Sequence, residues 1–178
     1  MKKVLILTLI SLTLLFGCGD KKQKKTANSA NGNLTLPKFE LSIPDSKEKL
    51  ESKKLEEIIV ISFISDFCGP CIKELESIKR IQDTYENKNV DYLILIIGDG
   101  TDYLKDIDSL QLKTHIALAD SNFLGKLKIG SIPTRLLFSN NELLYRLEGT
   151  PSYKEPEFRE ELDKLLGIVR TDTLEIEN

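Results

Sequence analysis

The sequence is poor in metal-binding and nucleophilic side chains, with three cysteines and one histidine among 178 residues. A structural zinc site needs about four ligands, and the pair Cys68 and Cys71 has no second cysteine pair to complete one. His115 lies in an apolar stretch far along the chain, so a cysteine–histidine catalytic pair is not predicted. We expect neither a metal nor another cofactor, and we interpret His115 as structural.

Excess basic charge and long apolar runs are also missing. From Leu34 onward, 19 lysine and arginine residues face 27 aspartate and glutamate residues, which gives a net charge of −8. Phosphate binding needs a basic face, so no nucleic acid partner is expected. A transmembrane helix needs roughly 20 apolar residues. The run from Val4 to Phe16 ends too soon at Gly17, so it does not predict a permanent span.

The amino terminus instead has the pattern of an export signal, with a basic Met1-Lys2-Lys3 start before the apolar run. The stretch Leu15-Phe16-Gly17-Cys18 resembles the lipobox of bacterial lipoproteins, in which the cysteine is lipidated and becomes the new N-terminus. We expect residues 1–17 to be a lipoprotein signal peptide and Cys18 to be the lipid anchor. An ordinary secretory signal that is cut nearby is the alternative.

Residues 18–33 combine the anchor with lysines and small polar residues, which indicates a flexible tether. A segment of this length spans about 20–25 Å on average, so the domain would stay close to the lipid surface. Its lysines either contact anionic headgroups or are simply solvated. Residues 34–167 suit one globular domain, and residues 168–178 form a polar C-terminal tail.

Apolar patterns in the first half of the domain predict a strand, a helix and a second strand. The run Ile58–Ile64 is apolar on both alternating faces, as in a central strand covered by helices. Pro70 fits a first helical turn, and apolar residues then recur at helical spacing, which predicts a helix over Gly69–Asn87. A second buried strand at Val90–Ile97 ends at Gly98, so the two strands should be parallel.

The second half predicts shorter elements and an antiparallel hairpin. They are a helix near Tyr103–Leu110, an apolar piece at His115–Leu118, a helix around Phe123–Leu127, strands Thr134–Phe138 and Leu143–Leu147 joined by Ser139–Glu142, and a helix with an apolar face from Phe158 to Leu166 that stops at Gly167. The fold class is therefore α/β, a single domain with a central mixed β-sheet flanked by helices.

Cys68-Gly69-Pro70-Cys71 lies at the junction of the first strand and helix, and cysteines at this spacing can form a reversible disulfide. Unpaired N–H groups and the positive end of the helix dipole favour a thiolate at Cys68, the predicted nucleophile. Cys71 would resolve the mixed disulfide. A zinc site and a purely structural disulfide are the alternatives, but the latter leaves Gly69-Pro70 at this junction unexplained.

The motif Phe67-Cys68-Gly69-Pro70-Cys71, together with Ser131-Ile132-Pro133-Thr134 downstream, resembles the thioredoxin superfamily. The resemblance covers most of Leu34–Gly167. The lipoprotein anchor, the inserted segment between Asp99 and Thr114, and Glu74 are similar to the TlpA/ResA group of extracytoplasmic thiol:disulfide oxidoreductases.

The resemblance implies roles for several residues. It implies that Pro133 is cis and packs against the cysteines, and that the Ile132 backbone binds an extended substrate. Phe67 replaces the usual tryptophan and would cover one side of the disulfide. Ser62 replaces the buried carboxylate of thioredoxins proper. Glu74 would tune proton transfer, or it is an ordinary solvated helix residue.

The function implied by the resemblance is that of a thiol:disulfide oxidoreductase, acting as a reductase and tethered by lipid to a membrane in the cell envelope. Its partners would be disulfides of exported proteins, apocytochrome c among them in cytochrome c maturation, and a membrane thiol carrier that donates electrons. A thiol peroxidase and a thioredoxin-fold binding lipoprotein with a structural disulfide are the alternatives.

Overall fold

The computed structural model describes residues 34–66, 68–99, 101–149 and 155–169. The predicted signal peptide, the Cys18 anchor, the tether, Phe67 and most of the predicted tail lie outside these ranges. Within them, every helix is too short or too polar to span a lipid bilayer.

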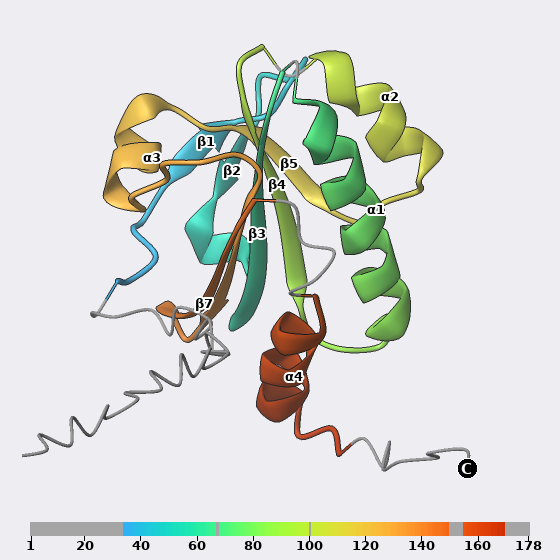
Figure 1. The fold of residues 1–178 in the computed structure, drawn as a ribbon. Coiled ribbons are helices and arrows are strands. Elements are labelled where there is room, and N and C mark those ends of the chain that lie inside the picture. Colours follow the sequence, from blue (N-terminus) through green and yellow to red (C-terminus); the bar gives the residue numbers. More distant parts are fainter. Residues whose placement is uncertain (1–33, 67, 100, 150–154, 170–178) are drawn as a thin grey trace, which may run out of the picture.

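The described core is a five-stranded mixed sheet with the strand order β5-β4-β3-β6-β7 (Figure 1). Its strands are β3 (Ile58–Ser65), β4 (Asp91–Ile97), β5 (His115–Leu118), β6 (Thr134–Ser139) and β7 (Glu142–Glu148). β3 pairs in parallel with β4 and antiparallel with β6, and β6 pairs antiparallel with β7. The predicted parallel crossover and the predicted hairpin are therefore both confirmed.

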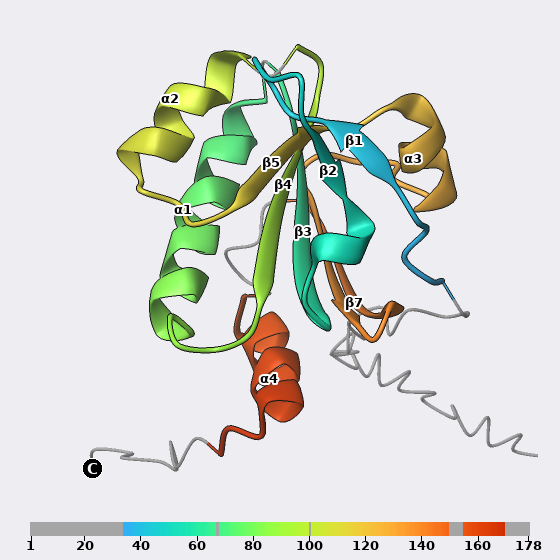
Figure 2. The same cartoon turned by 180° about the vertical axis from the view of Figure 1, so that it is seen from behind.

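Helices cover both faces of this sheet (Figures 1 and 2). The helices in the described ranges are α1 (Gly69–Thr84), α2 (Thr101–Ser109), α3 (Ser121–Lys126) and α4 (Glu155–Leu166). Apolar residues of α1, α2 and α4 share one core cluster with one face of the sheet, and α3 packs on the other face. The alternation of β3 explains this division, because Val60 and Ile64 join the first cluster whereas Ile61 and Phe63 join the second.

Two short strands were not predicted, β1 (Glu40–Ser42) and β2 (Lys49–Glu51), which form an antiparallel pair. Their inward residues Leu41 and Leu50 belong to the cluster under α3. A 3₁₀ turn at Ser52–Lys54 follows. A three-residue strand with one buried side chain carries too little periodicity to be recognised in the sequence.

The ends of two helices differ from the prediction. α1 ends at Thr84 rather than Asn87, because Tyr85 leaves helical geometry as the C-cap while its N–H still bonds the Ile81 and Gln82 carbonyls. The buried Tyr85 ring continues the apolar period and so extended the predicted helix. α2 begins at Thr101, before the predicted Tyr103.

The sheet has two distinct ends. The cysteine motif follows the carboxyl end of β3, after Ser65. At the other end, Ile58 of β3 pairs with Ser139 beside the β6–β7 turn. The described N-terminal segment lies at that second end, where Thr35 bridges Glu142 and the Leu143 N–H bonds the Leu34 carbonyl at 3.0 Å.

Candidate functional site

Cys68 and Cys71 form a disulfide across the first turn of α1, with their Cα atoms 5.4 Å apart. Cys68 is the N-cap residue, in extended geometry, and the Cys71 N–H bonds its carbonyl at 2.9 Å. Cys71 is fully buried and Cys68 is partly exposed, while Gly69 and Pro70 between them are exposed. A visiting group from solvent would therefore meet Cys68 before Cys71.

The Ile132–Pro133 peptide bond is cis, as the resemblance implies. Pro133 is buried, immediately before β6, and Ile132 is partly buried against both core clusters. Thr134 fixes this turn by donating its hydroxyl to the Ser131 carbonyl at 2.7 Å. Cys68 packs on one of the two clusters that Ile132 touches, so the downstream motif and the cysteines border a common part of the core.

Glu74 is buried, with 1% of its surface exposed, so its interpretation as a solvated helix residue is wrong. Its Oε1 atom accepts a hydrogen bond from Ser62 Oγ at 2.6 Å and one from Arg135 Nε at 2.8 Å. Ser62 is the position at which the resemblance to thioredoxins would imply a buried carboxylate. A carboxylate from α1 is nevertheless bound to that serine and joined to Arg135 of β6 by an ion pair.

The buried polar contacts continue from Arg135 toward α4. Arg135 Nη2 donates to Ser77 Oγ at 2.9 Å, and that hydroxyl donates to Glu155 Oε2 at 2.7 Å. The Arg135 guanidinium also lies 5.0 Å from the centre of the Phe158 ring. Hydrogen bonds thus link the residue three positions after Cys71 to the first residue of α4.

Glu155 is the last acceptor in this series of hydrogen bonds. It also forms ion pairs with two further arginines, Arg80 at 2.9 Å and Arg159 at 3.0 Å. Burial raises the pKa of Glu155, but hydrogen bonds from Arg80 and Ser77 and the charges of both arginines outweigh it and hold the pKa below its ordinary value. The carboxylate therefore joins α1 to α4 in its charged form.

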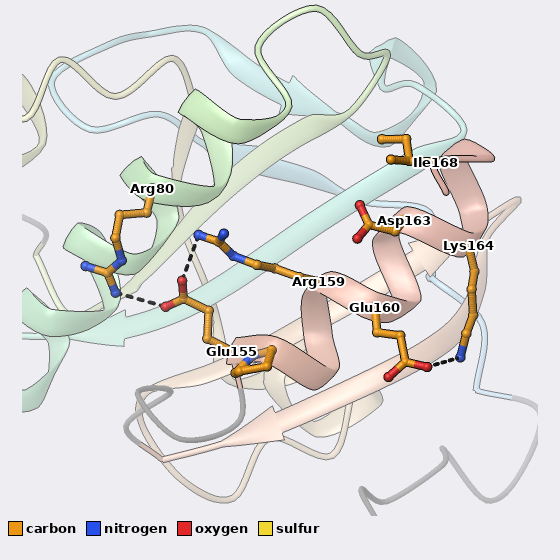
Figure 3. Close-up of a pocket in the computed structure, with 8 residues that line it drawn as sticks. Arg80, Glu155, Arg159, Glu160, Asp163, Lys164 and Ile168 are labelled. Carbon is orange, nitrogen blue, oxygen red and sulfur yellow. Dashed lines mark hydrogen bonds and ion pairs between the residues drawn. The ribbon is translucent and has the colours of Figure 1, made fainter. Parts of the chain in front are cut away.

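A pocket of about 710 Å³ opens beside this ion-pair group, between α1 and α4 (Figure 3). Its walls include Arg80, Glu155, Arg159 and Lys164, so they carry both cationic and anionic side chains. None of its lining residues belongs to the cysteine motif or to the segment around Pro133. Among the described residues, no three His, Cys, Asp or Glu side chains are grouped so that they could hold a metal ion.

The segment from Gly98 through α2, here called the β4–α2 segment, contacts Asp66 and Cys68, on either side of residue 67. The Asp99 N–H donates to Asp66 Oδ2 at 2.9 Å, and the Tyr103 hydroxyl donates to the Cys68 carbonyl at 2.6 Å. Gly98, at φ +124°, permits this approach, because a Cβ atom there would lie 1.8 Å from Asp66 Oδ2.

Sequence reasoning missed Arg135 and Tyr103. The available signal for Arg135 was a single charged residue at the start of a predicted strand whose next three residues are apolar, which indicates a buried charge that needs a partner. Nothing comparable marked Tyr103, because an aromatic residue in an amphipathic helix normally only fills the core. His115 is half-exposed at the start of β5, 3.4 Å from the Asp91 carboxylate. It is aligned with Ile61, four residues before the end of β3, and not with the cysteines.

No protein-family model matches the sequence, and no curated protein matches it. Solved structures do match. A Chlorobium tepidum protein provisionally described as thiol:disulfide interchange protein DsbE is 18% identical, with a TM-score of 0.66, over 76% of this chain and 97% of its own. A second Chlorobium tepidum structure, a thiol:disulfide interchange protein of the thioredoxin family, is 16% identical, with a TM-score of 0.63, over 76% and 98%.

A third match is the thioredoxin domain of a thiol-disulfide oxidoreductase from Bacteroides vulgatus, 14% identical with a TM-score of 0.58 over 72% of this chain and 97% of that domain. These likenesses cover nearly all of each matched chain at low sequence identity. The TM-scores of 0.58 to 0.66 show that the backbone arrangement is shared despite this low identity. The chain therefore has a thioredoxin-like fold.

Proposed function

We propose that this protein is a thiol:disulfide oxidoreductase that exchanges disulfides with exported proteins through Cys68 and Cys71. The observation that carries the proposal is the disulfide across the first turn of α1, with one partly exposed and one buried cysteine. The fold supports it, since the three matched structures are described as interchange proteins or oxidoreductases.

The two cysteines have different roles in the proposed reaction. The Cys68 thiolate attacks one sulfur of the client disulfide, forms a mixed disulfide and releases the first client thiolate. The Cys71 thiolate then attacks the Cys68 sulfur, which forms the Cys68–Cys71 bond and releases the second client thiolate. The client gains two electrons and, from solvent, two protons. A membrane thiol carrier returns two electrons and reopens the pair.

Cys68 suits the attacking role for two reasons. It is the more exposed cysteine, and as the N-cap residue it lies at the positive end of the α1 helix dipole. Cys71 lies in the core cluster, next to Cys68, so the sulfur that its thiolate can attack is the Cys68 sulfur.

The remaining site residues support this exchange in the proposal. Gly69 and Pro70 keep the turn between the cysteines open, and Phe67 covers one side of the disulfide. The Ile132 backbone beside cis Pro133 binds the client segment. Glu74 tunes proton transfer from its buried position between α1, β3 and β6.

The proposed location is outside the cytoplasm, with the domain of residues 34–167 held to a membrane through lipidated Cys18 and residues 19–33. The signal pattern of residues 1–17 and the lipobox-like stretch ending at Cys18 support this arrangement. The clients are then disulfides of exported proteins, including apocytochrome c, and the direction of exchange is reduction.

Turbidity of insulin with dithiothreitol tests the proposal on the full chain in detergent. Wild type should accelerate the precipitation of the insulin B chain, and Cys68→Ser should return it to the uncatalysed rate. Cys18→Ser is the matched control, because it removes a cysteine but retains Cys68 and Cys71. It should retain the wild-type rate in detergent, and in cells it should no longer be found in the membrane fraction. Equal rates of insulin precipitation for wild type and Cys68→Ser would contradict the proposed function.

Two further measurements separate the alternatives. Hydrogen peroxide consumption with dithiothreitol should stay at the uncatalysed rate, whereas a thiol peroxidase would consume it. Cys71→Ser should trap covalent, reductant-sensitive partners in cells, whereas a binding module with a structural disulfide would trap none. An alkylation gel shift that finds Cys68 and Cys71 mostly reduced in cells supports the reductase direction.

A further inference from the structure

Tyr103 reaches the cysteine motif from α2. Its hydroxyl donates to the backbone carbonyl oxygen of Cys68 at 2.6 Å, and only 5% of the residue is exposed. The ring packs in the core cluster that contains Cys71. Packing therefore fixes the ring while the hydroxyl fixes the carbonyl of the residue that carries the proposed nucleophile.

The carbonyl that Tyr103 binds also connects the two cysteines. It accepts the Cys71 N–H at 2.9 Å, which is the hydrogen bond that closes the turn spanned by the disulfide. Cys68 is the N-cap of α1, and its own side chain makes no capping hydrogen bond. The orientation of the Cys68 peptide is thus set by two donors on one oxygen, and one of these donors belongs to a different helix.

The same β4–α2 segment holds the chain on the other side of residue 67. Asp66 Oδ2 accepts a hydrogen bond from the Asp99 N–H at 2.9 Å. This oxygen can lie so close to the backbone of residue 98 because Gly98 has no Cβ atom. Hydrogen bonds from one segment therefore hold both Asp66 and Cys68. Figures 1 and 2 both show α2 beside the start of α1, which agrees with this contact.

We propose that Tyr103 is a positioning residue for Cys68, whose hydroxyl sets how readily the Cys68–Cys71 bond opens. The inference rests on the exchange proposed above. When the bond opens, a thiolate forms at Cys68 beside the partial negative charge of its own carbonyl. A hydroxyl donated to that carbonyl offsets the charge and favours the thiolate. A more stable reduced form makes a pair more oxidising.

The redox equilibrium with glutathione tests this role on the full chain in detergent. Two glutathione molecules supply the two electrons and two protons that convert Cys68–Cys71 to the dithiol, and they form one glutathione disulfide. Tyr103→Phe should shift this equilibrium constant about 3- to 10-fold toward the protein disulfide, the factor given by a hydrogen bond of ordinary net strength. Thiolate absorbance near 240 nm should then develop at higher pH than in wild type.

Tyr85→Phe is the matched control, because it also removes one buried phenol hydroxyl. That hydroxyl donates to Asp163 at 2.7 Å, at the far end of α1 from the cysteines. Tyr85→Phe should lower the free energy of unfolding yet keep the wild-type glutathione equilibrium. Incorporation of 3-fluorotyrosine at position 103 keeps the ring and strengthens the donor, so it should shift the equilibrium toward the dithiol.

Three outcomes decide the matter. A Tyr103→Phe protein that folds and keeps the wild-type equilibrium and thiolate titration overturns the inference, even if it is less stable. An equal redox shift in Tyr85→Phe also overturns it. If Tyr103→Phe does not fold, the fluorotyrosine protein decides alone, with an unchanged equilibrium counting against the role. Wild type that is inert toward insulin refutes the proposed function instead, while the glutathione equilibrium still reports on Tyr103.

Discussion

Arg135 is buried, although arginine side chains normally lie at the protein surface. Its side chain is fully buried, and the Nε and Nη2 atoms are bound to Glu74 and Ser77. The Nη1 atom is buried as well and has no hydrogen-bond partner among the described residues. Arg135 and Glu74 therefore bind each other rather than water. Arg135 lies two residues after Pro133 on β6, and Glu74 lies three residues after Cys71 on α1.

Breaking this pair should cost much more than removing both charges. Arg135→Met leaves Glu74 as an uncompensated buried charge and should lower the free energy of unfolding by about 3–5 kcal/mol. The double variant Glu74→Gln with Arg135→Met removes that charge and should recover most of the loss. Urea unfolding at neutral pH measures both.

The control for this comparison is Lys113→Met, which removes an exposed ion pair with Glu86. It should leave the urea midpoint unchanged within error, because exposed pairs contribute little. A double variant that is no more stable than Arg135→Met would show that the pair stabilises the fold through its contacts rather than by compensating a charge.

At the scale of single residues, the sequence predicted the two cysteines better than the buried residues around them. Cys68 and Cys71 were recognisable because spacing and a strand-to-helix junction define a disulfide across one helical turn. Glu74 was left between two interpretations, since the sequence does not contain the information that Arg135 lies opposite it. That pairing is a property of the sheet register, which places β6 beside β3 under α1.

Among the elements, the link from β4 to α2 has the strictest geometric requirement. Gly98→Ala should lower the free energy of unfolding by about 1–3 kcal/mol, because φ +124° is strained for any other residue. The new Cβ would also displace the Asp66 carboxylate from the Asp99 N–H. Thermal unfolding and insulin turbidity together measure this change, and we expect both stability and rate to fall.

Gly125→Ala is the same substitution with the opposite expected sign. Gly125 lies in α3, and a Cβ atom added there would meet no other atom within 4 Å, so alanine should stabilise the helix by roughly 0.5–1 kcal/mol. It should leave insulin turbidity unchanged. If both glycine variants lower stability equally, the close approach of Asp66 is not what constrains position 98.

The elements that could be predicted are those that bury a continuous apolar surface. β3 buries six consecutive residues, and the β6–β7 hairpin is marked by Asn140 and Asn141, which both adopt the left-handed conformation that such turns need. β1 and β2 could not be predicted, since one inward leucine each gives no period. Their position is decided by the long-range packing of Leu41 and Leu50 under α3.

For the molecule as a whole, the ion-pair group around Glu155 predicts an acid-sensitive connection between α1 and α4. The pKa of this carboxyl in the folded protein is below its ordinary value of 4.5. Its contribution to stability is therefore complete above about pH 4.5 and is lost as the pH falls through the folded-state pKa. Glu155→Gln should lack this part of the pH dependence.

Urea midpoints measured from about pH 7 down to about pH 3 test this expectation. The difference between wild type and Glu155→Gln should be largest near neutrality and should shrink in acid. Glu160→Gln, which alters an exposed carboxylate on the same helix, should follow the wild-type curve. A constant difference between wild type and Glu155→Gln at every pH would contradict the role of its charge.

The place where Leu34 joins the sheet decides how the molecule would face a bilayer. A lipid on Cys18 would pull from beside the β6–β7 turn, and β3, eight residues long, separates that point from Cys68 by roughly 25 Å. The disulfide would thus lie at the end of the sheet opposite the one to which the tether leads. To reach proteins that are still emerging from the membrane, the whole domain would have to tilt on its tether, whereas released proteins could approach the disulfide freely.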